Sequence, residues 1–271
     1  MPYINFQNKK IFYRIEGKGN PVLLLHGFGE DGNIWNKQIE SLKKSFLFII
    51  PDLPGSGQSE MLDGNATLED YSEVVKVIAD EAILKKEIEN QFCLIGHSMG
   101  GYITLAFAEK YPSFLNSFGL FHSSAYADTD EKINVRKKAI SFITENGTEA
   151  FLKTMIPNLF SEETKNKWPE LIEQLFKISK NISPEALIQY YKAMIKRAAR
   201  VSVLKSFEKP VLFIIGKEDT VIPLQLSLGQ CHIPSISTIH ILQHSGHMGM
   251  WEEEDLSNEF LKDFFQNLWP K

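Results

Sequence analysis

The sequence predicts an α/β protein built on a doubly wound, mostly parallel sheet of eight strands, with an all-helical segment inserted between two of them. Short continuous apolar runs are typical of strands that are buried on both faces, and helical patterns alternate with these runs along the chain. The alternation stops between about residues 123 and 209, where helical patterns occur without a strand candidate. The 271 residues, 43% of them hydrophobic, are enough for one large α/β domain or for a core with an insertion.

The predicted strands fall into two groups. Residues 3–6 and 11–15 alternate apolar and polar side chains, which predicts a hairpin with one face in water. Buried parallel strands are predicted at residues 22–25, 46–50, 92–95, 118–121 and 211–215. A weaker pattern near residues 238–242 predicts the last strand.

Helices are predicted from apolar side chains that recur at steps of three and four residues. Residues 68–88 show this pattern between two strand candidates. Inside the insertion, helices are predicted around residues 131–145, 162–178 and 184–199. We therefore expect a core formed by residues 1–122 and 210–271, and a helical cap formed by residues 123–209.

Composition and charge exclude several classes of function. The 29 Lys and Arg residues against 34 Asp and Glu residues give a net charge of -5, with no sustained run of either sign. No nucleic-acid partner is expected, because phosphate binding needs a concentrated basic face. No membrane span is expected either, because the longest charge-free stretches contain glycine pairs, prolines and histidines.

The cysteines and the first residues indicate a reducing compartment. Cys93 and Cys231 are far apart and cannot form a disulfide framework or a four-thiolate metal site. The first ten residues lack the basic, apolar and small-residue regions of a secretory signal. We expect a cytoplasmic protein that acts on a small molecule.

The sharpest chemical signal is a Gly-x-Ser-x-Gly sequence, in which Gly96 and Gly100 flank Ser98. It follows the strand candidate at residues 92–95 and precedes a helical run. Small residues on both sides allow a turn so tight that the serine hydroxyl projects above the sheet. The start of the following helix also favours developing negative charge. This context predicts that Ser98 is a nucleophile.

A serine nucleophile needs a base, and the base needs a carboxylate that orients it. Asp219 follows the strand candidate at residues 211–215, at the end of a parallel strand where such sheets place their active sites. His247 lies 28 residues further on, in a glycine-containing turn after the last strand. The three residues occur in the order serine, acid, histidine.

The sequence is identified as a member of the α/β-hydrolase superfamily, in the branch with a serine nucleophile and a helical cap after the sixth strand. The resemblance covers essentially the full length and rests on five segments in the family's order. They are His26-Gly27-Phe28-Gly29 with Trp35, residues 52–59, the Ser98 turn, the Gly216, Asp219 and Pro223 pattern, and Gly246-His247.

The resemblance implies a role for each matching residue. Ser98 is expected to be the nucleophile, His247 the general base and Asp219 the orienting acid. The backbone N–H groups of Phe28 and Met99 are expected to form the oxyanion hole. The Phe28 ring is then free to bind substrate.

Several neighbouring residues are alternatives. Glu218 is an alternative to Asp219, although the spacing to Pro223 favours Asp219. His26 and His97 flank the expected site and are interpreted as structural. His122, at the end of the sixth strand, is assigned to substrate binding, with loop support as the alternative.

A metal centre is conceivable from His240, His244 and His247, but the segment has the pattern of a strand followed by a turn and not that of a helix. No metal and no cofactor is therefore expected.

The cap contributes two kinds of side chain. Its apolar residues predict a mainly apolar pocket over a small or medium acyl group. The helix at residues 184–199 also carries basic residues, which are either a solvated surface or a site for a substrate carboxylate. These basic residues are Lys192, Lys196, Arg197 and Arg200.

These observations predict a serine hydrolase that cleaves a small, mainly apolar carboxylester-type substrate through an acyl-enzyme. Relatives that open epoxides or displace halide use a carboxylate nucleophile, whereas position 98 is serine. A carbon-carbon bond hydrolase or a perhydrolase remains an alternative with the same triad. The rival from another class is a small-molecule sensor with vestigial hydrolysis, and only that rival would need a protein partner.

Overall fold

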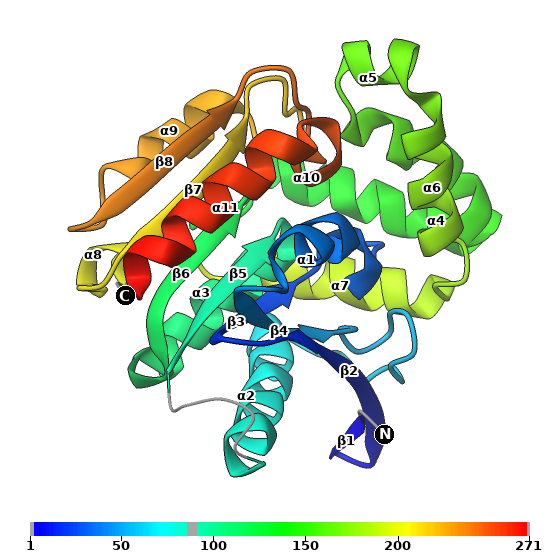
Figure 1. Ribbon diagram of the computed structural model, residues 1–271. Helices are drawn as coiled ribbons and strands as arrows, with labels where there is room; N and C mark the ends of the chain where they lie inside the picture. The colour runs from blue at the N-terminus through cyan, green and yellow to red at the C-terminus, as the bar shows by residue number, and fades with distance from the viewer. Residues whose placement is uncertain (1–2, 86–90, 270–271) are drawn as a thin grey trace.

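A computed structural model, which describes residues 3–85 and 91–269, has one eight-stranded sheet at its centre (Figure 1). The strand order is β1-β2-β4-β3-β5-β6-β7-β8. β2 runs antiparallel to both of its neighbours, and all other neighbouring strands are parallel. The prediction of a mostly parallel eight-stranded sheet is confirmed.

The burial of each strand explains how clearly it could be recognised. The strands are β1 (Tyr3–Phe6), β2 (Lys9–Gly17), β3 (Asn20–Leu25), β4 (Phe46–Pro51), β5 (Phe92–His97), β6 (Leu115–Phe121), β7 (Val211–Gly216) and β8 (Ser237–Leu242). Every residue of β5 and β7 is buried, as expected for inner strands covered on both faces. β8 lies at the edge of the sheet and is only partly buried, which accounts for its weaker pattern.

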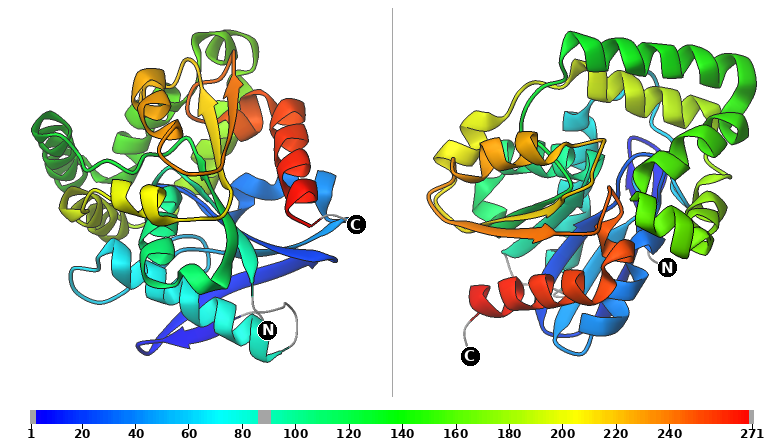
Figure 2. Two further views of the ribbon diagram at one scale, coloured as in Figure 1. Left: turned by 90° about the vertical axis from the view of Figure 1, so that its left-hand side faces the viewer. Right: turned by 90° about the horizontal axis from the view of Figure 1, so that it is seen from above.

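Helices cover both faces of the sheet. α1 (Asn36–Leu42) packs against α11 (Glu254–Leu268) on one face, and α2 (Leu68–Leu84) packs against α3 (Met99–Lys110) on the other (Figures 1 and 2). A capping box starts α2, because Thr67 accepts from the Asp70 amide while the Asp70 carboxylate accepts from the Thr67 amide. The predicted helix at residues 68–88 is confirmed as far as Leu84, and its last residues, 86–88, lie outside the described residues.

The described segment between β6 and β7 contains helices and no strand. They are α4 (Asp130–Met155), α5 (Glu162–Lys167), α6 (Pro169–Ser179), α7 (Pro184–Lys196) and α8 (Val201–Ser206), together with the 3-10 turn η3 (Ile156–Leu159). α4 packs along α7, and Figure 2 shows the two helices side by side.

The three predicted helices in this segment have different bounds, and the one predicted at residues 184–199 ends at Lys196. The helix predicted at residues 131–145 continues to Met155 across a kink at Gly147, whose φ of 79° lies outside the helical region. The helix predicted at residues 162–178 is two helices, because Pro169 has no N–H and disfavours a helical conformation at Trp168.

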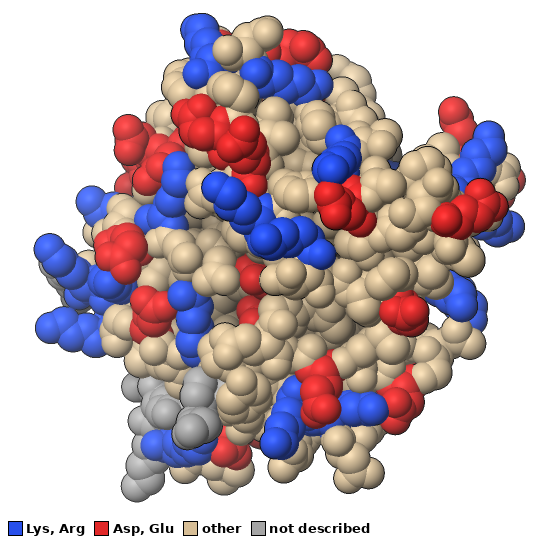
Figure 3. All heavy atoms as spheres, turned by 90° about the vertical axis from the view of Figure 1, so that its right-hand side faces the viewer, with Lys and Arg blue, Asp and Glu red and all other residues tan. Residues whose placement is uncertain are grey.

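The surface carries charges of both signs. On the face shown in Figure 3, acidic and basic side chains lie next to one another between uncharged areas. Within residues 3–85 and 91–269, no helix combines the length and the apolar character that crossing a bilayer requires.

Candidate active site

Ser98 occupies a strained turn between the end of β5 and the start of α3. Its φ of 51° and ψ of -114° are unusual for a residue with a side chain. A Cβ at position 96 would lie 2.3 Å from the backbone carbon of Gly100, and a Cβ at position 100 would lie 2.6 Å from the His26 carbonyl oxygen. The two glycines are therefore required by the close approach of the backbone, as the Gly-x-Ser-x-Gly spacing predicts.

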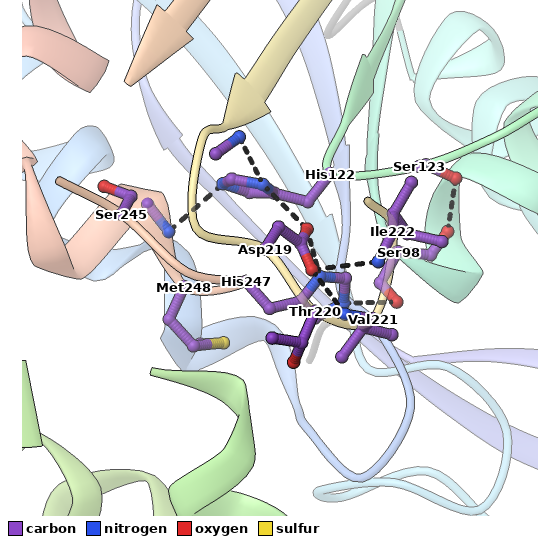
Figure 4. A network of polar contacts seen from close by, with 12 residues as sticks. Ser98, His122, Ser123, Asp219, Thr220, Val221, Ile222, Ser245, His247 and Met248 are labelled. Atoms are coloured by element: carbon purple, nitrogen blue, oxygen red, sulfur yellow. Dashed lines mark hydrogen bonds and ion pairs between the residues drawn. The ribbon is translucent and has the colours of Figure 1, made fainter. Parts of the chain in front are cut away.

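The structure brings Ser98, His247 and Asp219 together from three loops (Figure 4). The Ser98 Oγ lies 2.8 Å from His247 Nε2, and His247 Nδ1 lies 2.7 Å from Asp219 Oδ2. His247 and Asp219 are buried, while Ser98 is partly accessible. In this arrangement Nδ1 donates to the carboxylate, which leaves Nε2 free to take the hydroxyl proton of Ser98.

Asp219 is held as a carboxylate by the groups around it. Its Oδ1 accepts hydrogen bonds from the amides of Val221, at 2.8 Å, and Ile222, at 2.9 Å. Burial raises the pKa of Asp219, but the adjacent His247 and the hydrogen bonds from His122 and His247 outweigh it. The net pKa lies well below the usual range of an aspartate. The alternative acid, Glu218, is exposed and makes no hydrogen bond to His247.

His122 does not line the pocket, so its assignment to substrate binding is corrected. It is 1% exposed and lies behind Asp219, with Nδ1 3.2 Å from Asp219 Oδ2. Its Nε2 accepts from the Gly249 amide at 3.2 Å. Burial lowers the pKa of His122 to about 4, so the ring is neutral. Its Nδ1 lies between Asp219 Oδ2 and the Gly216 amide, whose nitrogen is 3.1 Å away. The loop-support alternative describes its position.

His97 and Glu30 form a buried ion pair beside the site. Glu30 Oε2 lies 3.0 Å from His97 Nδ1 and accepts from the Gly27 amide at 2.6 Å. Although burial opposes both charges, the Glu30 carboxylate raises the pKa of His97 and His97 lowers the pKa of Glu30. The other ring nitrogen, Nε2, donates to the His247 carbonyl oxygen at 2.9 Å. The ion pair therefore ties the Phe28 loop to the His247 loop.

The two backbone amides that are expected to bind the oxyanion have no acceptor among the described residues. Among the described residues, neither the Phe28 amide nor the Met99 amide has a protein hydrogen-bond acceptor. Met99 is the first residue of α3, where the N–H groups point out of the helix start. The Phe28 ring stacks on Tyr191 with 4.3 Å between ring centres, in the wall of the adjoining cavity.

A cavity of about 600 Å³ opens beside Ser98 and His247. Most of its lining is apolar and comes from both the core and the cap. The residues that form this apolar lining include Phe28, Tyr102, Met155, Leu159, Tyr191 and Met194. Among the other aromatic side chains of the cap, Tyr190 and Phe160 are buried within the protein, whereas Phe142 and Trp168 are exposed.

The remaining candidates lie elsewhere. The His240 ring stacks on Phe260, and the exposed His244 pairs with Glu163, so neither joins His247 in a metal site. His26 Nε2 accepts from the Leu53 amide and has the structural role expected of it.

The four basic residues predicted in the cap do not form a site for a substrate carboxylate at the cavity. Lys192 and Lys196 do not line the cavity, whereas Arg197 and Arg200 are buried in ion pairs. Several residues of the cavity wall, among them Glu30, Lys132 and Arg136, were not predicted from the sequence. Glu30 is one of two adjacent acidic residues in a glycine-rich loop, and Arg136 is one of several basic residues on a helix with an ordinary amphipathic pattern.

Comparisons with known proteins agree with this geometry. The family described as alpha/beta hydrolase fold matches residues 20–254. An uncharacterised hydrolase of Bacillus subtilis is 26% identical over 90% of this chain and 89% of its own length. A pimeloyl-[acyl-carrier protein] methyl ester esterase of Legionella pneumophila is 23% identical over 92% of this chain and 97% of its own.

The fold has a close structural counterpart. A thermophilic esterase from Thermogutta terrifontis, solved with malate bound, superposes with a TM-score of 0.90 at 27% identity, over 96% of this chain and 94% of that chain.

Proposed function

Because this chain belongs to the α/β hydrolase fold family, we propose that it cleaves carboxylic esters through an acyl-enzyme intermediate on Ser98. The observation that carries the proposal is the continuous set of hydrogen bonds from Ser98 through His247 to Asp219, beside two free amides and an open cavity. Each group required for acyl transfer is present within hydrogen-bonding reach of the next.

The proposed acylation step uses these groups together. Ser98 Oγ attacks the ester carbonyl carbon while His247 Nε2 takes the hydroxyl proton. The carbonyl electrons move to oxygen, and the Phe28 and Met99 amides hold the resulting oxyanion. One such donor stabilises the transition state by about 3 kcal/mol. The tetrahedral intermediate then collapses, the alcohol leaves with the proton from His247, and the acyl group stays on Ser98.

Deacylation repeats the sequence with water as the nucleophile. His247 takes a proton from water as the oxygen attacks the acyl carbon, and returns the proton to Ser98 as the acid leaves. Asp219 stays ionised throughout, in keeping with its lowered pKa, and stabilises the imidazolium form of His247. All of these groups belong to this chain.

The cavity supports a small or medium substrate. Its volume of about 600 Å³ lies within the range of ordinary small-molecule sites. Residues from α4, η3 and α7 form much of the wall opposite Ser98. We propose that residues 123–209 act as the substrate-binding cap of a core formed by residues 1–122 and 210–271.

Hydrolysis of a series of short p-nitrophenyl esters tests the proposal. The wild-type protein is expected to hydrolyse them, and Ser98→Ala is expected to lower kcat by at least about 10⁴-fold. Ser141→Ala, an exposed serine on α4, is the matched control and should keep wild-type activity. Absence of turnover in the wild-type protein on every ester of the series, or full activity in Ser98→Ala, would contradict the proposal.

A further inference from the structure

The mechanism proposed above leaves unused a pair of basic side chains in the cavity wall. Lys132 and Arg136 are one turn apart on α4, and both line the cavity that contains Ser98. Arg136 is only 9% exposed, so its guanidinium is held within the protein. Burial of a cation lowers the stability of a protein unless an opposite charge neutralises it.

The charge of Arg136 is only partly neutralised. Its Nε donates to Asp128 Oδ2 at 2.7 Å, and its Nη2 to Asp128 Oδ1 at 3.4 Å. Arg197 Nη1 lies 2.8 Å from the same Asp128 Oδ1. Two buried arginines therefore share one carboxylate, which leaves this cluster with one positive charge in excess.

The two arginines differ in how their N–H groups are used. Arg197 donates to the carbonyl oxygens of Met194 and Tyr126, and its guanidinium lies over the Tyr102 ring. Arg136 uses only the edge that faces Asp128. Among the described residues Nη1 has no acceptor, and Nη2 has a second N–H to spare. This outer edge has the fork geometry that binds a carboxylate with two hydrogen bonds.

The other charges at the cavity do not neutralise Arg136. Glu30 is already paired with His97. Glu131 is exposed and lies beyond ion-pair distance from Arg136. Lys132 adds a second cation, whose Nζ donates to the Val221 carbonyl oxygen at 2.9 Å and which has no carboxylate partner among the described residues.

The basic pair lies close to the expected oxyanion loop. The Arg136 guanidinium carbon is 5.6 Å from the centre of the Tyr191 ring, which in turn stacks on the Phe28 ring at 4.3 Å. A single aromatic side chain thus separates the cation from the residue whose amide would hold the oxyanion. A ligand of a few carbon atoms can bridge that separation.

We propose that Arg136, assisted by Lys132, binds a carboxylate on the substrate, so that the preferred ester carries a negative charge in its acyl or alcohol part. This assignment of substrate class rests on the proposed ester hydrolysis. The apolar walls contact the intervening carbon chain, and the carboxylate completes the hydrogen bonds of the Arg136 outer edge. The charge cluster of Arg136, Arg197 and Asp128 is then neutral.

Matched ester pairs test the proposal in the wild-type protein. In the acyl series, monoethyl esters of straight-chain dicarboxylic acids of four to eight carbons, roughly the reach of the cavity, are compared with ethyl esters of monocarboxylic acids of equal length. In the alcohol series, 4-acetoxybutyrate is compared with butyl acetate. We expect kcat/KM to be at least about tenfold higher for the charged ester in one series. A preference for the neutral ester in every pair would overturn the proposal.

Variants show whether Arg136 causes the preference. Arg136→Gln is expected to lower the charged-to-neutral ratio of kcat/KM by at least about tenfold, and Lys132→Gln to lower it less. Lys138→Gln removes one charge from the exposed side of the same helix and should leave the ratio unchanged. Arg136→Lys keeps the ion pair with Asp128 but loses the fork, so it should also lower the ratio and remains informative if the glutamine variant does not fold. A wild-type ratio in Arg136→Gln or Arg136→Lys would overturn the assignment.

A binding measurement separates this proposal from ester hydrolysis itself. Ser98→Ala protein is titrated calorimetrically with monoethyl hexanedioate and with ethyl hexanoate, and the titration is repeated with Arg136→Gln added. Tighter binding of the charged ester that depends on Arg136, in a protein whose wild-type form hydrolyses no ester, would overturn only the hydrolase proposal. Turnover without charge preference would overturn only the carboxylate site.

Discussion

The loops that carry Ser98, Asp219 and His247 differ from the cap in how tightly the backbone constrains each position. Around Ser98, an added Cβ at Gly96 or Gly100 meets backbone atoms at less than 3 Å. At the kink in α4, an added Cβ at Gly147 meets no atom within 4 Å. Close backbone contacts thus fix the geometry of the Ser98 turn in the core. In the cap, by contrast, much of the pocket wall consists of helix side chains, whose replacement does not disturb such backbone contacts.

Within the core, the largest effect is expected from His247→Ala, which removes the proposed base. We expect kcat to fall by about 10⁴-fold or more, since His247 is the one residue in the described part of the chain that is hydrogen-bonded to Ser98 Oγ. His244→Ala is the matched control, because His244 is exposed and bonded away from the site. Steady-state hydrolysis of a p-nitrophenyl ester measures both. If His244→Ala were inactive and His247→Ala active, the proposed base would be wrong.

Glycine substitutions test the contrast in backbone constraint directly. Gly96→Ala places a Cβ 2.3 Å from the Gly100 backbone and is expected to lower the free energy of unfolding by more than about 3 kcal/mol. Gly147→Ala has space around its Cβ, but the φ of 79° and ψ of 174° at this position are rarely adopted by other residues, so it should cost about 1 to 3 kcal/mol. Urea unfolding of the two variants gives the comparison, and equal losses would show that the two regions do not differ.

Because His122 is buried in the core, we expect the stability of the protein to depend on pH through this residue. Its pKa is lowered to about 4, so the unfolded chain takes up this proton first as the pH falls. Stability should fall by roughly 3 kcal/mol between pH 6.5 and 4 on this account. The lowered pKa values of Asp219 and Glu30 act mainly below that window, because those carboxyls become protonated in the unfolded chain only near pH 4.

His122→Asn removes the titrating group and should abolish most of that difference. Urea unfolding at pH 6.5 and at pH 4, for both proteins, measures it. The contribution of the partly buried His240, whose pKa is also lowered by burial, is common to both and cancels. A fall in stability as large in His122→Asn as in the wild-type protein would assign the effect to other groups.

In the cap, smaller and selective effects are expected. Met155→Ala enlarges the cavity at its cap side, so the preferred acyl chain should become longer, with a change of about 10- to 100-fold in the ratio of kcat/KM between long and short esters. Lys153→Ala, on the same helix but outside this cavity, is the control. An unchanged chain-length profile would mean that Met155 does not limit the acyl group.

The same contrast explains which parts of the site could be predicted from sequence. The glycine pair around Ser98 and the strand ends before Asp219 and His247 are local patterns with one steric meaning, so the position of each residue could be predicted. The wrong assignment of His122 to substrate binding also has a local cause. A residue at a strand end can face the pocket or the interior, and the backbone of His122, with a φ of 50°, places its ring behind Asp219.

The cap could be predicted only as a set of helices. Arg136 has the spacing of any residue on an amphipathic helix, and its special position depends on Asp128 and Arg197, which come together only in the tertiary structure. Glu30 likewise gains its partner, His97, from another loop. Pairings between distant segments leave no local pattern in the sequence, so the proposed carboxylate site could not be found there.

The most direct test of the proposed chemistry is to identify the nucleophilic residue, which displaces fluoride from a fluorophosphonate and keeps the phosphonyl group. The wild-type protein is treated with a fluorophosphonate, digested, and analysed by mass spectrometry, with Ser98→Ala and Ser141→Ala treated in parallel. We predict one adduct, on the peptide that contains Ser98, in the wild-type protein and in Ser141→Ala, and none in Ser98→Ala. An adduct that persists in Ser98→Ala, or that maps to another residue of the wild-type protein, would contradict the account.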